Sequence, residues 1–236
     1  ACALLTADGT VVPGVRVENG SYGLTCDALL GVRSAHASTG SAAPIALAFA
    51  HPHTESNRLI ARAWTGRAEA YDEHVLLLSN DPIPPLGDWW APQPTPPTGD
   101  DTSPDALCDH AMSLASERAI VSESDFPVGC WGESVAADGT AYWIPGVNVE
   151  SSDWSRILCA ERAVIHLAHA LSLPMPDRFY LACVRVDGSP CGACRQWLTE
   201  HAVSAEIWMH RRNGTPTLTH PPALLPGAFD AVSLRI

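Results

Sequence analysis

The sequence is poor in basic residues and lacks a long apolar run. Its 14 Lys and Arg residues stand against 26 Asp and Glu residues, which gives a net charge of −12. This balance disfavours binding to a phosphate backbone, because such binding needs basic side chains to displace counterions. No stretch reaches the roughly 18 apolar residues of a membrane span, and residues 1–10 show no basic region of a secretory signal. We therefore expect no nucleic-acid partner and no membrane association.

Cysteine is also scarce, with eight residues in a chain of 236. This is too few for a disulfide scaffold at such a length. Five of them lie mostly among apolar neighbours and are expected to be buried free thiols: Cys2, Cys26, Cys108, Cys130 and Cys183. A reducing, cytoplasmic location fits this usage best. The 46% of hydrophobic residues suffices for the core of one large or two small domains.

A Pro-rich stretch divides the chain into two halves. Residues 81–104 cannot form a regular helix or a central strand, and Trp89 and Trp90 suggest that part of this connection is held on a surface. The flanking segments resemble each other, because residues 7–18 (ADGTVVPGVRVE) and 137–150 (ADGTAYWIPGVNVE) share a turn and a Gly-Val-x-Val-Glu ending. This similarity predicts an internal duplication, with a first domain at 1–81, a linker at 82–103 and a second domain at 104–236.

The second half shows the clearer pattern of elements. We expect helices at 104–121, 159–172 and 192–201, a hairpin of strands at 130–136 and 142–149, and further strands at 178–186 and 205–210. Strands that alternate with helices in this way indicate an α/β fold of three layers, α/β/α.

Three cysteines of the second half fit a metal site. Cys191 and Cys194 are spaced to lie on one face at the start of a helix, and Cys159 begins another helix. Helix N-termini carry partial positive charge, which favours thiolates. Three thiolates with one open position are typical of catalytic zinc, because a structural zinc site takes a fourth protein ligand. A water at the open position is made acidic by the metal, and Glu161 is placed to move its proton.

Two other interpretations of these cysteines remain open. The Cys-x-x-Cys pair could be a redox pair, although Cys159 and Glu161 would then be unexplained. A closed structural zinc site could instead use His166 or His169 as a fourth ligand.

Beyond the metal motif, the second half resembles the cytidine deaminase family over about residues 104–229. The matching segments are Ser124–Gly129 (SDFPVG), Asn148–Glu150 (NVE), Cys159–Arg162 (CAER), Pro190–Gln196 (PCGACRQ) and Leu224–Phe229 (LLPGAF). The zinc-deaminase signature, a His or Cys two residues before a Glu and then Pro-Cys-x-x-Cys, is present in its all-cysteine form. The resemblance implies a cytidine-deaminase-like fold in two tandem copies.

The resemblance also implies residue roles. One Zn²⁺ per chain would be held by Cys159, Cys191 and Cys194 beside the catalytic Glu161. The substrate contacts would be Phe126 and Ala160 in the base pocket, Asn148 and Glu150 at the ribose hydroxyls, and Phe229 over the base, usually in a neighbouring subunit. Arg162 would moderate the negative charge of the thiolates, and Pro190 would support the second ligand loop.

The resemblance implies hydrolytic deamination of cytidine and 2′-deoxycytidine to the uridine products. Departures at the substrate rim, which include Ser122-Glu123, Cys130-Trp131, Ser151 and Trp154, leave open a modified cytosine nucleoside, such as a nucleoside antibiotic, as the substrate. A non-catalytic, zinc-stabilised regulator is a second alternative. A nucleic-acid cytosine editor would need basic and aromatic tracks, for which the chain has few residues.

The first half lacks the catalytic residues at the matching positions. Asp27 stands at the first ligand position, Leu29 at the position of the catalytic Glu, and His53 and Ser56 at the cysteine pair. We expect a degenerate, non-catalytic copy, although a second metal site at His51 and His53 is an alternative. A homodimer of such fused pairs would form a pseudo-tetramer.

Overall fold

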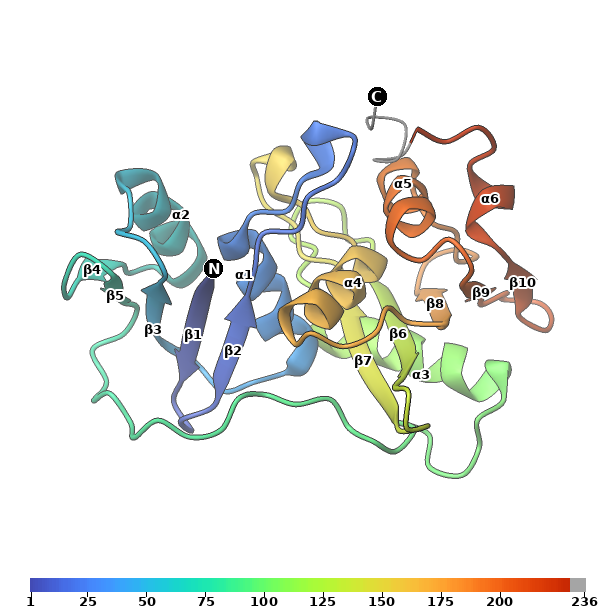
Figure 1. Ribbon diagram of the computed structural model, residues 1–236, viewed down its shortest axis with the longest axis horizontal. Coiled ribbons are helices and arrows are strands. Elements are labelled where there is room, and N and C mark those ends of the chain that lie inside the picture. Colours follow the sequence, from blue (N-terminus) through green and yellow to red (C-terminus); the bar gives the residue numbers. More distant parts are fainter. Residues whose placement is uncertain (230–236) are drawn as a thin grey trace.

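The computed structural model describes residues 1–229 and contains two five-stranded sheets joined by a long connection (Figure 1). The first sheet has the order β2-β1-β3-β5-β4, with antiparallel neighbours throughout. Its strands are β1 (Cys2–Thr6), β2 (Val11–Gly14), β3 (Pro44–Phe49), β4 (Glu69–Ala70) and β5 (Val75–Leu77). Residues 230–236 of the expected second domain lie outside the described range.

The second sheet has the order β10-β9-β8-β6-β7. Its strands are β6 (Val128–Val135), β7 (Ala141–Val147), β8 (Arg178–Cys183), β9 (Glu206–Met209) and β10 (Thr217–Thr219). The helices of this half are α3 (Pro104–Arg118), α4 (Ala160–Ala170), α5 (Gly192–His201) and the short α6 (Pro221–Leu224). Strands β8 and β9 are parallel and the other neighbours antiparallel. Every helix and strand expected in this half is therefore present, with ends shifted by a few residues.

Helices cover both faces of the second sheet. A Cβ at Gly129 would lie 2.0 Å from the carbonyl oxygen of Ala111 in α3, whereas a Cβ at Gly132 would lie 2.3 Å from a methyl group of Val164 in α4. Because residues an odd number apart in a strand face opposite sides, α3 and α4 pack on opposite faces. The expected three-layer α/β/α arrangement is confirmed for this half.

The first half repeats one packing detail of the second. Its helices are α1 (Ala28–Thr39) and α2 (Glu55–Thr65). A Cβ at Gly14 of β2 would lie 2.4 Å from the carbonyl oxygen of Ala28, and a Cβ at Gly146 of β7 would lie 2.2 Å from that of Ala160. Each glycine lets the start of a helix approach an edge strand closely. The order β2-β1-β3 thus matches β7-β6-β8, but the match ends there, because β3 and β5 pair antiparallel whereas β8 and β9 pair parallel.

The two halves meet through α1 and α4, which pack against each other between the sheets (Figure 1). Each helix also contacts the edge strand of the other half. The backbone N–H of Val15 donates to Nε2 of His166 at 3.2 Å, and that of Val147 donates to Oγ of Ser38 at 3.0 Å. The two edge strands therefore find hydrogen-bond acceptors in the partner half.

The connection between the halves is held on both sheets. Trp89 forms a β-bridge with Val11 and Gln93 forms one with Trp143, while the backbone N–H of Trp90 donates to the carbonyl oxygen of Val11 at 2.9 Å. The segment is thus held on a surface as expected, through its backbone and the side chain of Trp90, which packs against the core, whereas Trp89 is 58% exposed.

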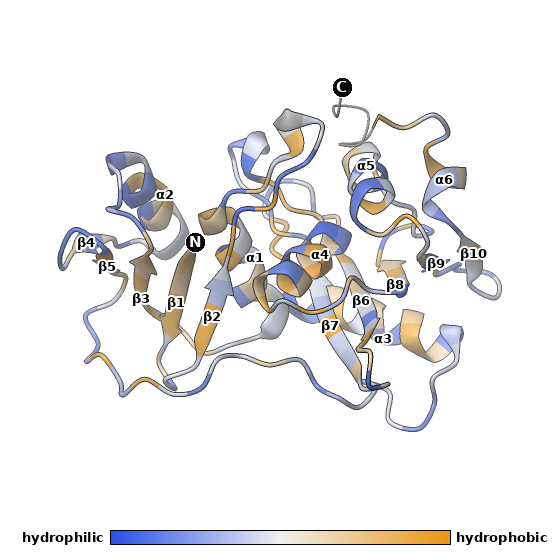
Figure 2. Ribbon diagram, viewed as in Figure 1, coloured by the Kyte–Doolittle hydropathy of each residue, from blue (hydrophilic) through white to orange (hydrophobic). Residues whose placement is uncertain are grey.

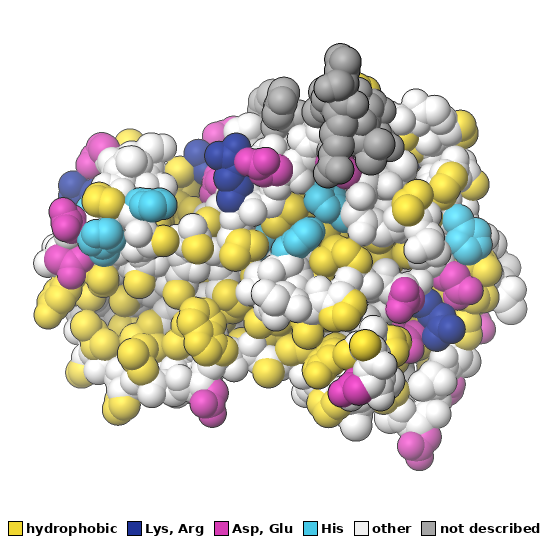
Figure 3. Space-filling view, viewed as in Figure 1, with side chains coloured by type: hydrophobic (Ala, Val, Ile, Leu, Met, Phe, Trp, Pro, Cys, Tyr) yellow, Lys and Arg dark blue, Asp and Glu magenta, His cyan; other side chains and the backbone are white. Residues whose placement is uncertain are grey.

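Side-chain polarity follows this arrangement. Strands β1 to β3 are largely apolar, whereas α2 carries hydrophilic residues (Figure 2). The five cysteines expected to be buried are buried and free. On the face shown in Figure 3, the coloured basic side chains occur at a few separate places and form no continuous track. Among the described residues, no helix is long and apolar enough to span a bilayer.

Candidate metal and catalytic site

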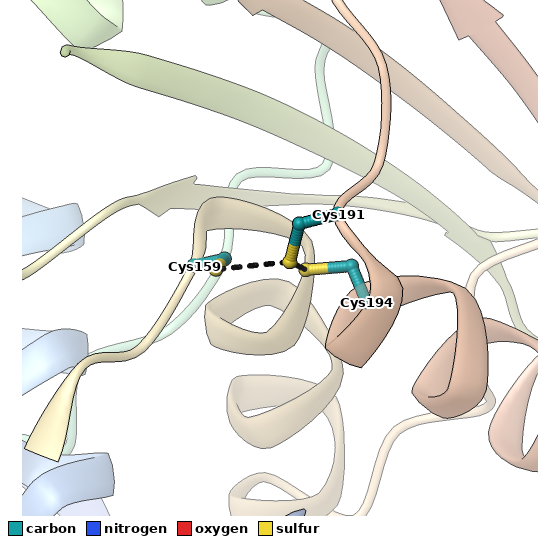
Figure 4. Close-up of side chains that lie close together, drawn as sticks. All are labelled: Cys159, Cys191 and Cys194. Atoms are coloured by element: carbon teal, nitrogen blue, oxygen red, sulfur yellow. Dashed lines mark hydrogen bonds between the residues drawn. The ribbon is translucent and has the colours of Figure 1, made fainter. Parts of the chain in front are cut away.

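Three thiols from two helix starts converge on one point (Figure 4). Cys159 is the N-cap residue of α4 and Cys191 is that of α5, while Cys194 lies in the first turn of α5. The sulfur of Cys191 lies 3.6 Å from each of the other two sulfurs, and all three lie within 4.8 Å of one another. The structure thus brings together the three residues that the sequence analysis singled out as metal ligands.

The chemistry of this donor set fits a zinc ion. Neither N-cap cysteine makes the usual side-chain cap hydrogen bond, so both sulfurs are free to ligate. Hydrogen bonding with Cys159 and Cys194 lowers the pKa of the Cys191 thiol, whereas the hydrogen bond with Cys191 raises the pKa of Cys159 and burial raises that of Cys194. Without an ion, Cys191 is therefore the one thiol of the three for which the thiolate is favoured. Within residues 1–229, no other group of three His, Cys, Asp or Glu side chains is arranged to hold a metal.

The histidines considered as a fourth ligand lie elsewhere. His166 Nε2 accepts from the backbone of Val15, and His169 Nε2 lies 3.3 Å from Nδ1 of His201. Neither belongs to the group of converging ligand atoms. The interpretation of a closed zinc site completed by one of these histidines is therefore wrong for this structure.

Glu161 lies directly beside the sulfurs. It is in the first turn of α4, is 3% exposed, and its Oε2 accepts from Sγ of Cys194 at 3.3 Å. Desolvation by burial, and then the negative charge at Cys191, raise the pKa of Glu161 from 4.5 to about 7. A carboxyl group of this kind can both take up and release a proton near neutral pH.

Arg162 supplies a positive charge to the same cluster. Its Nη2 donates to the carbonyl oxygen of Ile157 at 2.8 Å and lies 3.8 Å from Sγ of Cys159. Its guanidinium also lies over the ring of Trp197, at 5.9 Å from the centroid. Burial disfavours its charge, but the negative charges at Cys159, Cys194 and Cys191 together outweigh that effect, and the pKa of Arg162 is raised.

The two residues expected at the ribose are buried and hold a loop. Oδ1 of Asn148 accepts from the backbone of Val128 at 2.8 Å, and its Nδ2 donates to the carbonyl oxygen of Phe126 at 2.9 Å. Oε2 of Glu150 accepts from the backbone N–H groups of Glu123 at 3.1 Å and Ser124 at 3.0 Å. Oε1 of Glu150 accepts from the hydroxyl of Ser124. These side chains therefore fix the loop that carries Phe126.

The remaining expected site residues lie around this loop and the cysteines. Phe126 is 39% exposed and Phe229 is 47% exposed, while Ala160 is fully buried between Cys159 and Glu161. The carbonyl oxygen of Phe229 accepts from Nε2 of Gln196 in α5. Pro190 is buried before the second ligand loop, and its carbonyl oxygen accepts from Nε of Arg195 at 2.8 Å.

One contact to this region was not found from the sequence. Nη2 of Arg33, in α1 of the first half, donates to the carbonyl oxygen of Glu150 at 2.8 Å. The two residues are far apart in the chain, and no motif marks Arg33, so only the three-dimensional structure reveals the contact.

In the first half, helix-capping residues stand where the second half has its cysteines. Asp27 is the N-cap of α1 and accepts from the backbone of Leu30 at 2.9 Å. Thr54 is the N-cap of α2 and forms a capping box with Asn57. Counted from the helix starts, Thr54 and Asn57 of α2 stand where Cys191 and Cys194 stand in α5, one residue beyond His53 and Ser56, which the motif suggested.

The histidines of this loop do not build a metal site among the described residues. His51 is exposed, and Nε2 of His53 lies 2.9 Å from the carbonyl oxygen of Asp72. Neither belongs to a group of three suitable ligands within residues 1–229.

Comparisons with known proteins find cytidine deaminases, and the family model places its match in the second half. Residues 102–210 match the family model of the cytidine and deoxycytidylate deaminase zinc-binding region. The chain is 39% identical over 124 residues to a cytidine deaminase of Sporosarcina psychrophila, a match that covers 51% of this chain and 87% of the relative. It is 38% identical over 122 residues to a cytidine deaminase of Mycobacterium tuberculosis, covering 49% and 81%.

Among solved structures, the chain is similar to the cytidine deaminase from Burkholderia pseudomallei, with 29% sequence identity and a TM-score of 0.46. That match covers 52% of this chain and 97% of the other.

Proposed function

Because the chain belongs to the cytidine deaminase family, we propose that it hydrolyses cytidine and 2′-deoxycytidine to uridine and 2′-deoxyuridine, with release of ammonia. The observation that carries this proposal is the convergence of three thiols around a point beside the buried carboxyl of Glu161. Net acidity and the scattered basic side chains of Figure 3 favour a free nucleoside over a single-stranded nucleic acid.

Cys159, Cys191 and Cys194 would hold one Zn²⁺ per chain. When bound, the ion would supply a water molecule of lowered pKa and an electrophilic centre. Arg162 would offset the excess negative charge of three thiolates, because its guanidinium already lies against Cys159. The second half, residues 104–236, would thus be the catalytic domain.

Glu161 would move the protons of the reaction. It would take a proton from the attacking water and deliver it to N3 of cytosine, while the oxygen forms a bond to C4. Glu161 would then take the proton of the new C4 hydroxyl and pass it to the exocyclic nitrogen, so that the C4 carbonyl forms, the C4–N bond breaks and ammonia leaves. Burial of Glu161 against Cys194 keeps bulk water from competing for these transfers.

The substrate would lie between the cysteines and the loop that carries Phe126. Phe126, Ala160 and Phe229 would contact the base, and Asn148 and Glu150 the ribose hydroxyls. The Glu150 carboxylate accepts three hydrogen bonds from the loop. Since a carboxylate offers about four lone-pair positions, one ribose hydroxyl can still be accepted without loss of these contacts.

The first half, residues 1–81, would be a degenerate copy that no longer binds zinc, followed by a linker at 82–103. The caps at Asp27, Thr54 and Asn57 support this reading, because each occupies a ligand position with a residue that satisfies the helix instead. A homodimer of this two-domain chain would form a pseudo-tetramer.

The function is tested by incubating the zinc-loaded chain with cytidine, 2′-deoxycytidine and a set of modified cytosine nucleosides, and measuring uridine and ammonia formation. We expect turnover of cytidine and 2′-deoxycytidine. Turnover of a modified nucleoside alone would replace the proposed substrate, and zinc binding without any turnover would indicate a regulator.

A variant isolates the role of Glu161. Glu161→Gln should retain zinc and lose about 10²- to 10⁴-fold in kcat, the usual size of a general acid–base contribution. Glu117→Gln, an exposed carboxyl on α3, is the matched control and should keep full activity. A fully active Glu161→Gln enzyme would refute this role.

A further inference from the structure

Helix α1 of the first half grips the backbone of the segment that carries Asn148 and Glu150. Oγ of Ser38 accepts from the backbone N–H of Val147 at 3.0 Å. Nη2 of Arg33 donates to the carbonyl oxygen of Glu150 at 2.8 Å. Asn148 and Glu150, the residues proposed for the ribose, are therefore bracketed by two contacts from the other half of the chain.

Strand β7, which leads into this segment, lies at the edge of its sheet. The sheet order leaves β7 with β6 as its one neighbour strand, and regular pairing ends at Val147. Beyond it, the N–H and carbonyl of Val149 pair with Leu158, whereas the flanking carbonyl of Asn148 and N–H of Glu150 pair with Ile120, so both edges of the segment are bound within the second half. Among the described residues, the first half supplies partners for two backbone groups at the ends of this segment, the N–H of Val147 and the carbonyl oxygen of Glu150.

The guanidinium of Arg33 is partly buried without a carboxylate within residues 1–229 to pair with its charge. Its side chain is largely withdrawn from water, and burial lowers its pKa. Among the described residues, no carboxylate forms a salt bridge with Arg33, and its one hydrogen bond is to Glu150. A desolvated guanidinium is unfavourable unless it is hydrogen-bonded, so the contact to the Glu150 carbonyl accounts for its orientation.

The helix α4 of the second half has apolar residues at the positions that correspond to Arg33 and Ser38. Helices α1 and α4 begin at the same place relative to Gly14 and Gly146. Counted from these starts, Ile165 stands in α4 where Arg33 stands in α1, and Ala170 stands where Ser38 stands. The polar pair is therefore present in the half that lacks the cluster of three cysteines and absent from the other.

Arg33 also borders a cavity at this junction. The cavity has a volume of about 400 Å³, and it is lined by Arg33 and Trp64 of the first half and by Glu123, Glu150 and Arg156 of the second. Glu150 thus borders this cavity, and the Arg33 guanidinium is hydrogen-bonded to its carbonyl oxygen there.

We propose that Arg33, assisted by Ser38, is a positioning residue for ribose recognition, through which the first half sets the place of Asn148 and Glu150. This inference rests on the proposed function, because it needs a nucleoside whose ribose is read by those two side chains. The first half then acts as a specificity element of the active site in the second.

The test compares two substrates that differ only at the ribose. Cytidine carries the 2′ and 3′ hydroxyls and 2′,3′-dideoxycytidine lacks both. Arg33→Met keeps the apolar stem of the side chain and removes the donor. It should lower kcat/KM for cytidine about 10-fold, mainly through a higher KM, as expected for the loss of one oriented hydrogen bond. For the dideoxynucleoside the change should be less than about 2-fold.

Controls separate positioning from stability. Arg33→Lys keeps a donor and should recover part of the preference for cytidine. Arg16→Met, at an exposed arginine near the start of the same half, should leave kcat/KM unchanged for both substrates. Ser38→Ala should reduce the preference in the same direction, so the proposal stays testable if Arg33→Met fails to fold.

Two results would overturn the inference. Equal losses on both substrates would mean that Arg33 only stabilises the fold, and an unchanged KM for cytidine would mean that it does not position Glu150. If the unmodified chain deaminates neither nucleoside, the proposed function itself has failed, which is a separate outcome seen before any variant is made.

Discussion

Asp27 and Cys159 occupy the same position in the two halves, since each is the N-cap residue of the helix that packs on an edge-strand glycine. Asp27 caps its helix through the backbone N–H of Leu30, whereas Cys159 makes no cap hydrogen bond and turns its sulfur to Cys191. The same place in the fold thus stabilises a helix in one half and is available to a metal in the other.

This relationship predicts that substitution of Asp27 affects stability, whereas substitution of Cys159 affects zinc binding and turnover. Asp27→Ala should lower the free energy of unfolding by about 1 kcal/mol, the typical loss for an N-cap, and leave zinc content and turnover unchanged. Cys159→Ala should lose zinc and turnover. Urea unfolding and metal analysis of the two purified variants measure both effects. Release of zinc by Asp27→Ala would contradict the assignment of the metal to the second half.

The close approach of α1 and α4 predicts a steric dependence between Gly31 and His166. A Cβ at Gly31 would lie 2.0 Å from Nε2 of His166, whose ring is fully buried. Gly31→Ala should therefore destabilise the chain by about 2 kcal/mol through overpacking, although alanine is the better helix former by about 1 kcal/mol.

In a His166→Ala background the same Gly31→Ala change should become neutral or stabilising, because the clash is gone. Denaturant unfolding of the four proteins gives the interaction energy directly. An identical loss in both backgrounds would show that the two halves do not pack through this pair.

Stability should also fall with acidity because of His166. Desolvation by burial lowers the pKa of His166 from 6.5 to about 4, against a smaller opposing effect of the Val15 hydrogen bond, and His169 adds to the lowering. In the unfolded chain His166 therefore binds a proton below about pH 6.5, whereas in the folded chain it stays neutral down to about pH 4. The contribution of His166 to the free energy of unfolding is complete above pH 6.5. It is lost as the pH falls from 6.5 to about 4, by up to about 3 kcal/mol.

His166→Gln removes this titration and keeps an oxygen that can accept from Val15. Urea unfolding at pH 5 and pH 7.5 should show a smaller difference for the variant than for the unmodified chain. His201, whose pKa burial also lowers to about 4, remains in both proteins and gives the residual slope. Equal pH dependence of the two proteins would exclude His166 as the source.

Much of the second half was predictable from sequence because its signals are local. Apolar spacing located α4 and α5, and the Cys-x-x-Cys motif at a helix start, with Cys159 at another, predicted a cluster that the structure contains. The buried state of the other five cysteines followed from their apolar neighbours.

The features that sequence could not predict depend on contacts between distant segments. The short strands β4 and β5, and the antiparallel pairing of β3 with β5, have no strong periodicity. The start of α2 at Thr54 could not be located from the cysteine motif, because the capping box of Thr54 and Asn57 shares no residue type with a Pro-Cys-x-x-Cys loop. The role of Asn148 and Glu150 in holding the loop of Phe126, and the reach of Arg33 to Glu150, become visible only when the strands and helices are assembled.

Deamination that depends on one zinc ion per chain is tested most directly by adding Zn²⁺ in steps to the metal-free chain and measuring the rate of cytidine deamination at each step. The rate should rise in proportion to added zinc and reach its plateau at about one ion per chain, because a single group of three thiolates holds the ion. A chain that deaminates cytidine fully without zinc, needs two ions, or stays inactive at every zinc level would contradict the account.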